Sequence, residues 1–290
     1  MPSENKKLIY TFIPNKCGSN SNGYRDYEYS YIKEGSIFRI IVIGDSVAQG
    51  QGVDLNQSFP KVLEQKLNAL ISGDGRKVQV INLARSGYTT SQELIILEQE
   101  AFLYSPDLII WSYVLNDPAH PYYDVGNPMG MYYFQPRFYT AELVTEAFVK
   151  IRERIMTRIC NTEYPAFVHC VYWKDVKSNI KSIAKLTGER GTPVILLIHP
   201  VFNDSGDFNS YPFRTLHKQL SSLASDNGIE VVDLTQAYLP YDPVELAQKK
   251  EAGLIDPWHP NIKGNEIVAN HILGVLKDNQ SFRDWAGKSY

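Results

Sequence analysis

The chain has 290 residues, of which 43% are hydrophobic and 12% aromatic, so it is long and apolar enough to bury a large core. Its formal net charge is −3 and it has no block of lysine and arginine, which argues against nucleic acid or an anionic membrane as a general partner. Cys17, Cys160 and Cys170 show no Cys-x-x-Cys spacing and indicate neither a thiolate zinc site nor a disulfide framework. We therefore expect reduced thiols.

The N-terminal residues lack the apolar stretch of a secretory signal, and no run approaches the ~20 apolar residues of a membrane span. From the sequence as written, we expect a cytoplasmic protein without a membrane span. A longer reading frame with an apolar segment upstream would overturn this expectation. Nothing in the residues predicts the oligomeric state.

In chain order, residues 1–37 are polar and rich in tyrosine, which indicates an extended arm packed on the domain. The next segment, Phe38 to Gly52, runs from a continuously apolar strand into Gly44-Asp45-Ser46 and a glycine-containing loop. Such a run is typical of a central parallel strand covered on both faces. Ser46 then stands at the carboxyl end of the strand, where open α/β sheets bind ligands. Taken alone, Gly-Asp-Ser is more often a turn in which Asp45 and Ser46 cap the next helix.

Strands and helices alternate along the rest of the chain. Four more apolar strands are predicted at residues 78–83, 108–113, 194–198 and 229–234. Amphipathic helices separate them, and Ser58 is the expected N-cap of the first helix. This alternation predicts βαβ units with right-handed crossovers. We expect one α/β domain over residues 1–290, with a central parallel sheet of about five strands and helices on both faces.

An insertion is predicted at residues 118–190, between the third and fourth strands. It is rich in aromatic residues up to Tyr139, and two apolar helical faces follow, the first from Val144 to Ile159 and the second from Val176 to Ile183. Because the insertion leaves from the carboxyl end of a strand, we interpret it as a lid or pocket wall over Ser46. Packing of the aromatic residues within the insertion, or a dimer contact, explains the pattern equally well.

Groups that could activate a serine occur near the C-terminus. A serine hydroxyl needs a base to take its proton and a third group to orient that base. His259 is the candidate base, and Asp256 precedes it by three residues, a spacing that can bring the carboxylate to the imidazole Nδ1. The same spacing also occurs in turns, at helix starts and in metal pairs.

Donors for a developing oxyanion are also present. Gly87 follows the second predicted strand and offers a bare backbone N–H, and Asn116 follows the third and offers a side-chain NH₂. Each has an ordinary interpretation as a turn residue. However, Ser46, Gly87, Asn116 and the Asp256/His259 pair all fall in loops after strands or at the entry to the last helix, and independent turns would rarely coincide in this way.

These residues resemble the four sequence blocks of the SGNH, or GDSL, hydrolases. The blocks are Gly44-Asp45-Ser46, Gly87 after Ile81-Asn82-Leu83, Asn116-Asp117, and Asp256-x-x-His259, so the resemblance covers residues 38–278 apart from the insertion. Residues 22–26 and the strand with Arg39 are similar to a bacterial branch in which an arm precedes the first block. Two positions depart from the family pattern: Val114 replaces a frequent glycine, and Val47 follows the serine where leucine or a similar residue is usual. The absence of a Gly-x-Ser-x-Gly elbow argues against the α/β-hydrolase fold.

The resemblance implies a three-layer flavodoxin-like fold and an esterase. Ser46 would be the nucleophile, His259 the base and Asp256 its orienting group, and the oxyanion hole would consist of the N–H groups of Ser46 and Gly87 with the Asn116 side chain. We expect cleavage of short acyl esters of a sugar or small metabolite through an acyl-enzyme, without metal or cofactor. An O-acyltransferase with the same triad, or a non-catalytic glycan-binding module, are the alternatives. Further substrate contacts are expected from Asp45, Tyr88, Asp117, Tyr122, Tyr123, His199 and Trp258.

Overall fold

The structure, a computed structural model, describes residues 1–118, 151, 154–160, 162–203, 207–250 and 253–287, apart from positions 2, 6 and 72–74. Its central sheet has five parallel strands in the order β2-β1-β3-β4-β5, which confirms the predicted α/β fold. The strands are β1 (Ile37–Gly44), β2 (Lys77–Asn82), β3 (Leu108–Tyr113), β4 (Val194–Ile198) and β5 (Glu230–Asp233). The sequence analysis did not predict the small antiparallel pair of β6 (Ala247–Lys249) and β7 (Ile255–Pro260).

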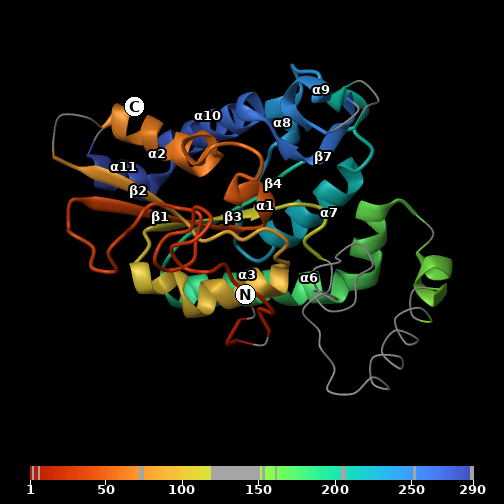
Figure 1. The fold of residues 1–290 in the computed structure, drawn as a ribbon, viewed down its shortest axis with the longest axis horizontal. Coiled ribbons are helices and arrows are strands. Elements are labelled where there is room, and N and C mark those ends of the chain that lie inside the picture. Colours follow the sequence, from red (N-terminus) through yellow and green to blue (C-terminus); the bar gives the residue numbers. More distant parts are fainter. Residues whose placement is uncertain are drawn as a thin grey trace.

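Helices cover both faces of the sheet (Figure 1). One layer contains α2 (Phe59–Leu70), α10 (Ile262–Asp278) and α11 (Gln280–Ala286), and the other contains α3 (Thr90–Gln99), α6 (Tyr164–Glu189) and α7 (Arg214–Ser225). Short helices lie between the longer elements: α1 (Ser46–Gln49), α8 (Thr235–Tyr238), α9 (Pro243–Leu246), and 3₁₀ turns at Leu55–Gln57, Ala101–Tyr104 and Phe208–Ser210. Ser58 precedes α2 as expected, but its hydroxyl donates to Leu55 O and does not cap the helix.

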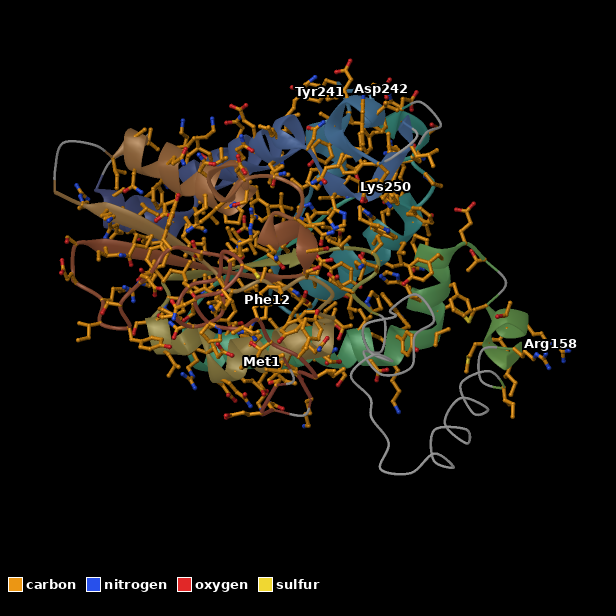
Figure 2. The ribbon with its side chains drawn as sticks, viewed as in Figure 1. Met1, Phe12, Arg158, Tyr241, Asp242 and Lys250 are labelled. Atoms are coloured by element: carbon orange, nitrogen blue, oxygen red, sulfur yellow. A yellow bond between two sulfur atoms is a disulfide. The ribbon has the colours of Figure 1, made fainter. Side chains whose placement is uncertain are left out.

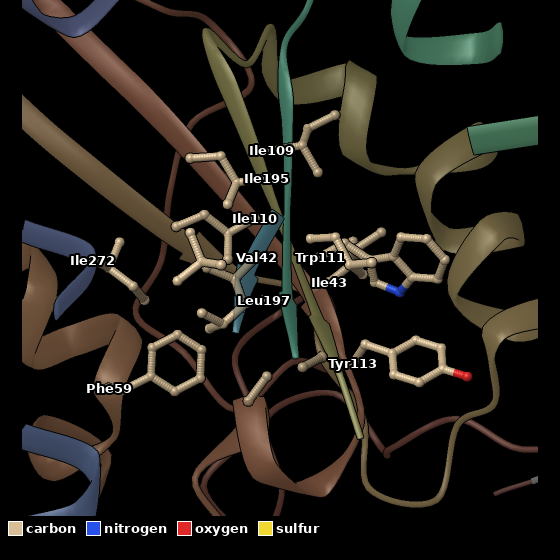
Figure 3. Close-up of a cluster of buried hydrophobic side chains, with 14 of the residues drawn as sticks. Val42, Ile43, Phe59, Ile109, Ile110, Trp111, Tyr113, Ile195, Leu197 and Ile272 are labelled. Carbon is tan, nitrogen blue, oxygen red and sulfur yellow. The ribbon is translucent and has the colours of Figure 1, made fainter. Parts of the chain in front are cut away.

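Successive side chains of a strand point to opposite faces of the sheet. Because helices cover both faces, the side chains of the central strands are buried on either side. Figure 3 shows Val42 and Ile110 facing Phe59 of α2, whereas Trp111 and Tyr113 lie on the other side of the sheet. All five side chains are 0% exposed. The two-sided burial explains why these strands appear in the sequence as continuous apolar runs rather than alternating ones.

The register of the sheet brings three loops to one edge. β1 lies between β2 and β3, with Val42 opposite Asn82 and Gly44 opposite Ser112. All three strands run parallel, so their carboxyl ends meet at the same side of the sheet. The segments that carry Ser46, Gly87 and Asn116 leave from these three ends.

The predicted insertion is only partly an insertion. Residues 119–150, which include Tyr122, Tyr123 and the proposed lid, lie outside the described residues. The second predicted helix is α6, and its buried residues Val176, Ile180 and Ile183 belong to the main core, so it is the crossover from β3 to β4. Residues 154–159 are helical, but Ile155 and Ile159 are 50% and 68% exposed. Arg158 of this segment lies far from the sheet (Figure 2).

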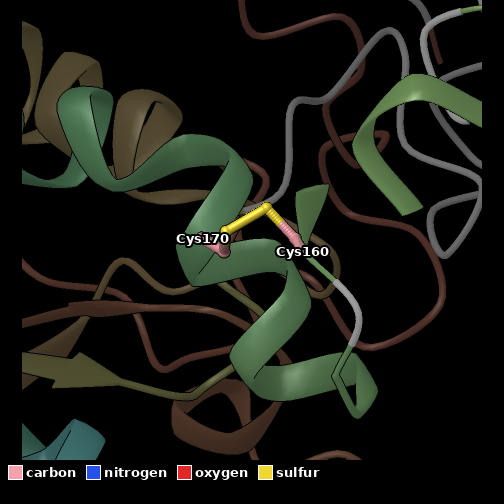
Figure 4. Close-up of a disulfide and its surroundings, with 2 residues drawn as sticks. All are labelled: Cys160 and Cys170. Carbon is pink, nitrogen blue, oxygen red and sulfur yellow. A yellow bond between two sulfur atoms is a disulfide. The ribbon is translucent and has the colours of Figure 1, made fainter. Parts of the chain in front are cut away.

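A disulfide joins Cys160 to Cys170, with a Cα–Cα distance of 6.0 Å (Figure 4). The bond links the end of the helical segment at residues 154–159 to α6. It corrects our expectation that these cysteines are reduced thiols. A spacing of ten residues gives no sequence signal, because only the reversal of the chain before α6 brings the two residues together. Cys17 is free and exposed.

The arm reaches the sheet edge through Arg25. In Figure 1 the arm (red) crosses the front of the molecule near α1 and α3. The Arg25 guanidinium donates to the carbonyls of Gln49, Gly50 and Val53 at 3.1, 2.8 and 2.6 Å. These acceptors lie at and just after the end of α1, where helix carbonyls lack intrahelical donors. The arm therefore caps the short helix that begins with Ser46.

Asp26 adds a buried ionic contact. Its carboxylate accepts the Asn82 N–H at 2.6 Å and lies 2.6 Å from Lys61 Nζ, and the two charged side chains are 0% and 1% exposed. Burial raises the Asp26 pKa to about 6 although Lys61 opposes the shift. The pair connects the arm to α2 and to the end of β2.

Two more carboxyl groups, Glu93 and Asp117, are buried under the carboxyl edge of the sheet. Glu93 accepts Trp111 Nε1–H at 2.8 Å, and Asp117 accepts the Val114 N–H at 2.6 Å. The second oxygen of each carboxyl has no hydrogen-bond partner within the described part of the chain. Burial, followed by repulsion from neighbouring carboxylates that include Asp45, raises both pKa values well above their ordinary range.

Replacing Lys61 should show how much a buried Asp26 carboxylate destabilises the protein when its charged partner is removed. Lys61→Met leaves Asp26 without its partner, so we expect a loss of about 3–5 kcal/mol in the free energy of unfolding, measured with urea at pH 8. The loss should shrink at acidic pH, where Asp26 becomes protonated. The control is Lys66→Met, which breaks the half-exposed Lys66–Glu266 pair at 3.3 Å and should cost about 0–1 kcal/mol. Equal, small losses in both variants would contradict a structural role for the buried pair.

The raised pKa of Glu93 predicts a pH-dependent effect of Glu93→Gln. Protonated Glu93 contributes stability that is complete below its unfolded pKa and is lost as the pH rises through the higher folded pKa. A neutral glutamine can still accept from Trp111 and does not ionise. The difference in unfolding midpoint between Glu93→Gln and wild type should therefore increase in favour of the variant as the pH is raised from about 4 to about 8.

The matched control is Glu98→Gln, an exposed position on the same helix. Its difference from wild type should stay flat over this range. A flat profile for Glu93→Gln as well would show that Glu93 does not titrate at a raised pKa.

Candidate active site

Ser46 is held at the carboxyl end of β1 by a close backbone approach. A Cβ atom at Gly44 would lie 2.8 Å from Ser112 O on β3, so only glycine fits where the chain leaves the strand. Asp45 then caps α1 by accepting the Val47 N–H at 2.9 Å. Ser46 is the first residue of α1 and is 7% exposed. The turn interpretation of Gly-Asp-Ser is therefore correct as local structure, and the turn presents a serine hydroxyl.

His259 contacts this hydroxyl from β7. The distance between His259 Nε2 and Ser46 Oγ is 2.8 Å. The strand that carries His259 is fixed by pairing with β6 and by the Phe202 N–H, which donates to Pro257 O at 2.8 Å. Ser46 Oγ also lies 3.2 Å from Asp45 Oδ2, so the imidazole is the nearer of two acceptors.

Asp256 lies behind the imidazole. Its Oδ2 is 3.0 Å from His259 Nδ1, although the pair is not aligned as a regular hydrogen bond. Its Oδ1 accepts the N–H groups of Trp258 and His259 at 2.9 and 3.2 Å. Partial burial opposes ionisation, but the contacts with His259 and the backbone N–H groups outweigh it and lower the Asp256 pKa below its ordinary value. The residue is therefore a carboxylate at neutral pH and can orient the imidazole.

The loops after β2 and β3 meet at the same edge. The Arg85 N–H donates to Gly44 O at 3.1 Å, and the Thr90 N–H donates to Asp117 O at 3.0 Å. Gly87 adopts φ +76°, a conformation that favours glycine. Burial raises the Asp45 pKa, and an interaction with the Asn116 side chain opposes this shift, so Asn116 lies close to Asp45. The loops that carry Gly87 and Asn116 therefore lie at the same edge of the sheet as the segment that carries Ser46.

Four of the expected substrate contacts are buried and bonded to other protein groups. Asp45, Asp117, Tyr88 and His199 are at most 3% exposed. His199 Nε2 lies 2.9 Å from Ser112 Oγ, and burial lowers its pKa to about 3, so it is a neutral group in the sheet edge. These side chains support the edge from inside rather than facing a ligand. Residue type alone gave no indication of their burial.

Trp258, the residue before His259 in the chain, lines an open groove of about 490 Å³. Its ring lies 6.1 Å from that of Tyr164, at the start of α6, in an edge-to-face arrangement. Phe213 adds a third aromatic side chain, and Glu163, Asn203 and Ser210 add polar groups. The sequence analysis found Trp258 but missed the other residues, because they come from separate segments that only the tertiary fold brings together.

Among the described residues, no group of three or more His, Cys, Asp and Glu side chains is arranged to hold a metal ion. In the same part of the chain, no helix combines the length and apolarity that a membrane crossing requires.

Comparisons with known proteins agree with this architecture. The acetylxylan esterase Axe2 from Geobacillus stearothermophilus superposes with a TM-score of 0.52 at 16% identity, over 87% of this chain and 94% of Axe2. LAE5, an alpha/beta hydrolase enzyme from the metagenome of Lake Arreo, Spain, gives a TM-score of 0.51 at 17% identity, over 90% of this chain and 99% of LAE5. A comparison with curated proteins gave no match. The family model of the GDSL-like lipases and acylhydrolases matches residues 42–267. The chain therefore belongs to the GDSL-like lipase/acylhydrolase family, also called the SGNH hydrolases.

Proposed function

We propose that the protein is a serine esterase that removes acetyl or other short acyl groups from a sugar or small metabolite. The observation that carries the proposal is the 2.8 Å contact between Ser46 Oγ and His259 Nε2. His259 takes the hydroxyl proton as Oγ attacks the ester carbonyl. Asp256 holds the imidazole and stabilises the imidazolium that forms. His259 then returns the proton to the leaving alcohol, and water, activated by the same imidazole, releases the acid from the acyl-enzyme.

The oxyanion of the tetrahedral intermediate would receive three donors. These are the N–H groups of Ser46 and Gly87 and the side-chain N–H of Asn116. The Ser46 N–H also lies in the first turn of α1, where backbone donors lack intrahelical partners. Such donors act on charge that develops only in the transition state, so they lower the barrier without tightening substrate binding.

The groove beside Trp258 supports a glycan or similar polar alcohol as the leaving group. Its volume of about 490 Å³ falls within the range of ordinary ligand pockets. Aromatic side chains can cover the apolar C–H face of a sugar ring, and Asn203, Ser210 and Glu163 can bond its hydroxyl groups. Axe2, one of the structural neighbours, is an acetylxylan esterase.

The Cys160–Cys170 disulfide bears on location. Disulfides persist in oxidising compartments and are rare where cellular reductants act. This bond supports a location outside the cytoplasm, in place of the cytoplasmic expectation.

A comparison of two esters tests the proposal. We expect wild type to hydrolyse both an acetylated oligosaccharide and a small activated acetate ester, and Ser46→Ala to hydrolyse neither. Trp258→Ala should lower kcat/KM for the oligosaccharide roughly tenfold, since aromatic contacts of this kind contribute about 0.5–1.5 kcal/mol. Its effect on the small ester, which does not reach the groove, should be less than about twofold.

Tyr241→Ala is the control, because Tyr241 packs under Lys263 at 5.0 Å and does not line the groove. It should leave both reactions unchanged. A parallel loss for both esters in Trp258→Ala would remove the groove from the proposal. Full activity in Ser46→Ala would reject the serine mechanism, and faster transfer of the acyl group to an added sugar than to water would indicate an acyltransferase.

A further inference from the structure

The arm contacts the backbone that would stabilise the oxyanion. The Tyr10 hydroxyl donates a hydrogen bond to Ser86 O. Ser86 C=O and Gly87 N–H belong to one planar peptide unit, in which the two groups point in opposite directions. Any contact that fixes the carbonyl therefore also fixes the direction of the Gly87 N–H.

We propose that Tyr10 is a positioning residue for the reaction: its hydroxyl orients and polarises the Ser86–Gly87 peptide so that the Gly87 N–H is ready to donate to the oxyanion. This inference rests on the proposed esterase function. It assigns to the arm a role in catalysis that acts through the Ser86–Gly87 peptide.

The close fit between Tyr10 and Gly87 supports the assignment. A Cβ atom at Gly87 would lie 2.8 Å from the Tyr10 hydroxyl oxygen. The loop therefore needs glycine both for its φ of +76° and for the approach of the tyrosine. Gln49 Oε1 accepts the Ser86 N–H, so the loop is bonded both to the last residue of α1 and to the arm.

Tyr10 is itself held by the loop that it contacts. Its backbone carbonyl accepts the Tyr88 hydroxyl at 2.7 Å, and Arg85 Nη1 donates to that hydroxyl oxygen at 3.0 Å. The rings of Tyr10 and Tyr88 meet edge to face, with centroids 5.4 Å apart. Two residues earlier, Leu8 O accepts Gln92 Nε2–H of α3 at 2.8 Å. Tyr10 is 4% exposed, so water does not readily replace its hydroxyl.

The backbone before Tyr10 gives independent support. Ile9 adopts φ +64°, a conformation that is a genuine outlier for a β-branched residue. Such strain persists only where surrounding contacts impose it, and it concentrates near functional sites. Here the contacts on either side of Ile9, at Leu8 O and Tyr10 O, keep the arm in this conformation.

Tyr10→Phe tests the proposal because it keeps the ring and removes only the hydroxyl. The small activated acetate ester is the substrate, and active sites are counted by titration with a fluorophosphonate, so that only folded protein enters kcat. We expect kcat to fall about tenfold with KM nearly unchanged, less than the ~10²- to 10³-fold loss when a whole oxyanion donor is removed. A boronic acid that forms a tetrahedral adduct with Ser46 should bind more weakly by a similar factor.

Tyr104→Phe is the matched control. It also removes a tyrosine hydroxyl that bonds the arm, since Asn22 Nδ2 donates to it at 3.0 Å, but that contact lies outside the Gly87 loop. We expect wild-type kcat and boronate affinity for this variant, whatever its unfolding midpoint. Tyr88→Phe keeps the Tyr10 hydroxyl but loosens the arm backbone, and it should give an intermediate loss of kcat.

Two failures are distinguishable. Wild-type kcat and boronate affinity in both Tyr10→Phe and Tyr88→Phe would overturn the role of Tyr10 and leave the esterase proposal intact. A lowered unfolding midpoint in Tyr10→Phe without a change in kcat would likewise overturn it, since that is the result of a purely structural contact. Absence of Ser46-dependent turnover in wild type would overturn the esterase proposal and this inference together.

Discussion

The position of β1 between β2 and β3 is the constraint on which the candidate site depends. Parallel pairing on both sides brings the ends of three strands to one edge, and the register sets Gly44 against Ser112. The chain can turn there only because glycine has no Cβ atom. Ser46 consequently lies just beyond the end of the central strand β1. The loops that follow β2 and β3, and the strand β7, lie close to it there. The chemistry of the site is thus a consequence of sheet order and of one close backbone approach.

Polar groups of the arm hold this edge in place. Arg25 caps the end of α1, Asp26 joins the end of β2 to Lys61, and Tyr10 reaches the loop after β2. Removing such groups from water costs free energy, and their hydrogen bonds and ion pairs offset this cost only in part. They therefore contribute less to net stability than apolar residues of similar size would. What they provide is a defined geometry. The arm therefore belongs to the functional unit although it precedes the first strand of the sheet.

Much of the fold and the candidate residues could be predicted from local patterns. Continuous apolar runs identified all five strands of the central sheet, and the loops after them identified Ser46, Gly87 and Asn116. The pattern of α6 was also recognised, but an amphipathic helix has the same period whether it covers a sheet or lies in an insertion, so the sequence did not show that α6 packs on the main core. β7 contains two prolines and gave no strand signal. The burial of Asp117 and His199, the Cys160–Cys170 bond and the aromatic groove depend on contacts between distant segments, which no periodicity records.

The central claim is that His259 activates Ser46 as a nucleophile. The most direct measurement is the rate and site of covalent labelling by a fluorophosphonate, followed by peptide mass spectrometry. The account predicts one adduct per chain on the peptide that contains Ser46, no adduct in Ser46→Ala, and labelling slower by at least about 10²-fold in His259→Ala, as expected for loss of a general base. Labelling at another residue, or an undiminished rate in His259→Ala, would contradict it.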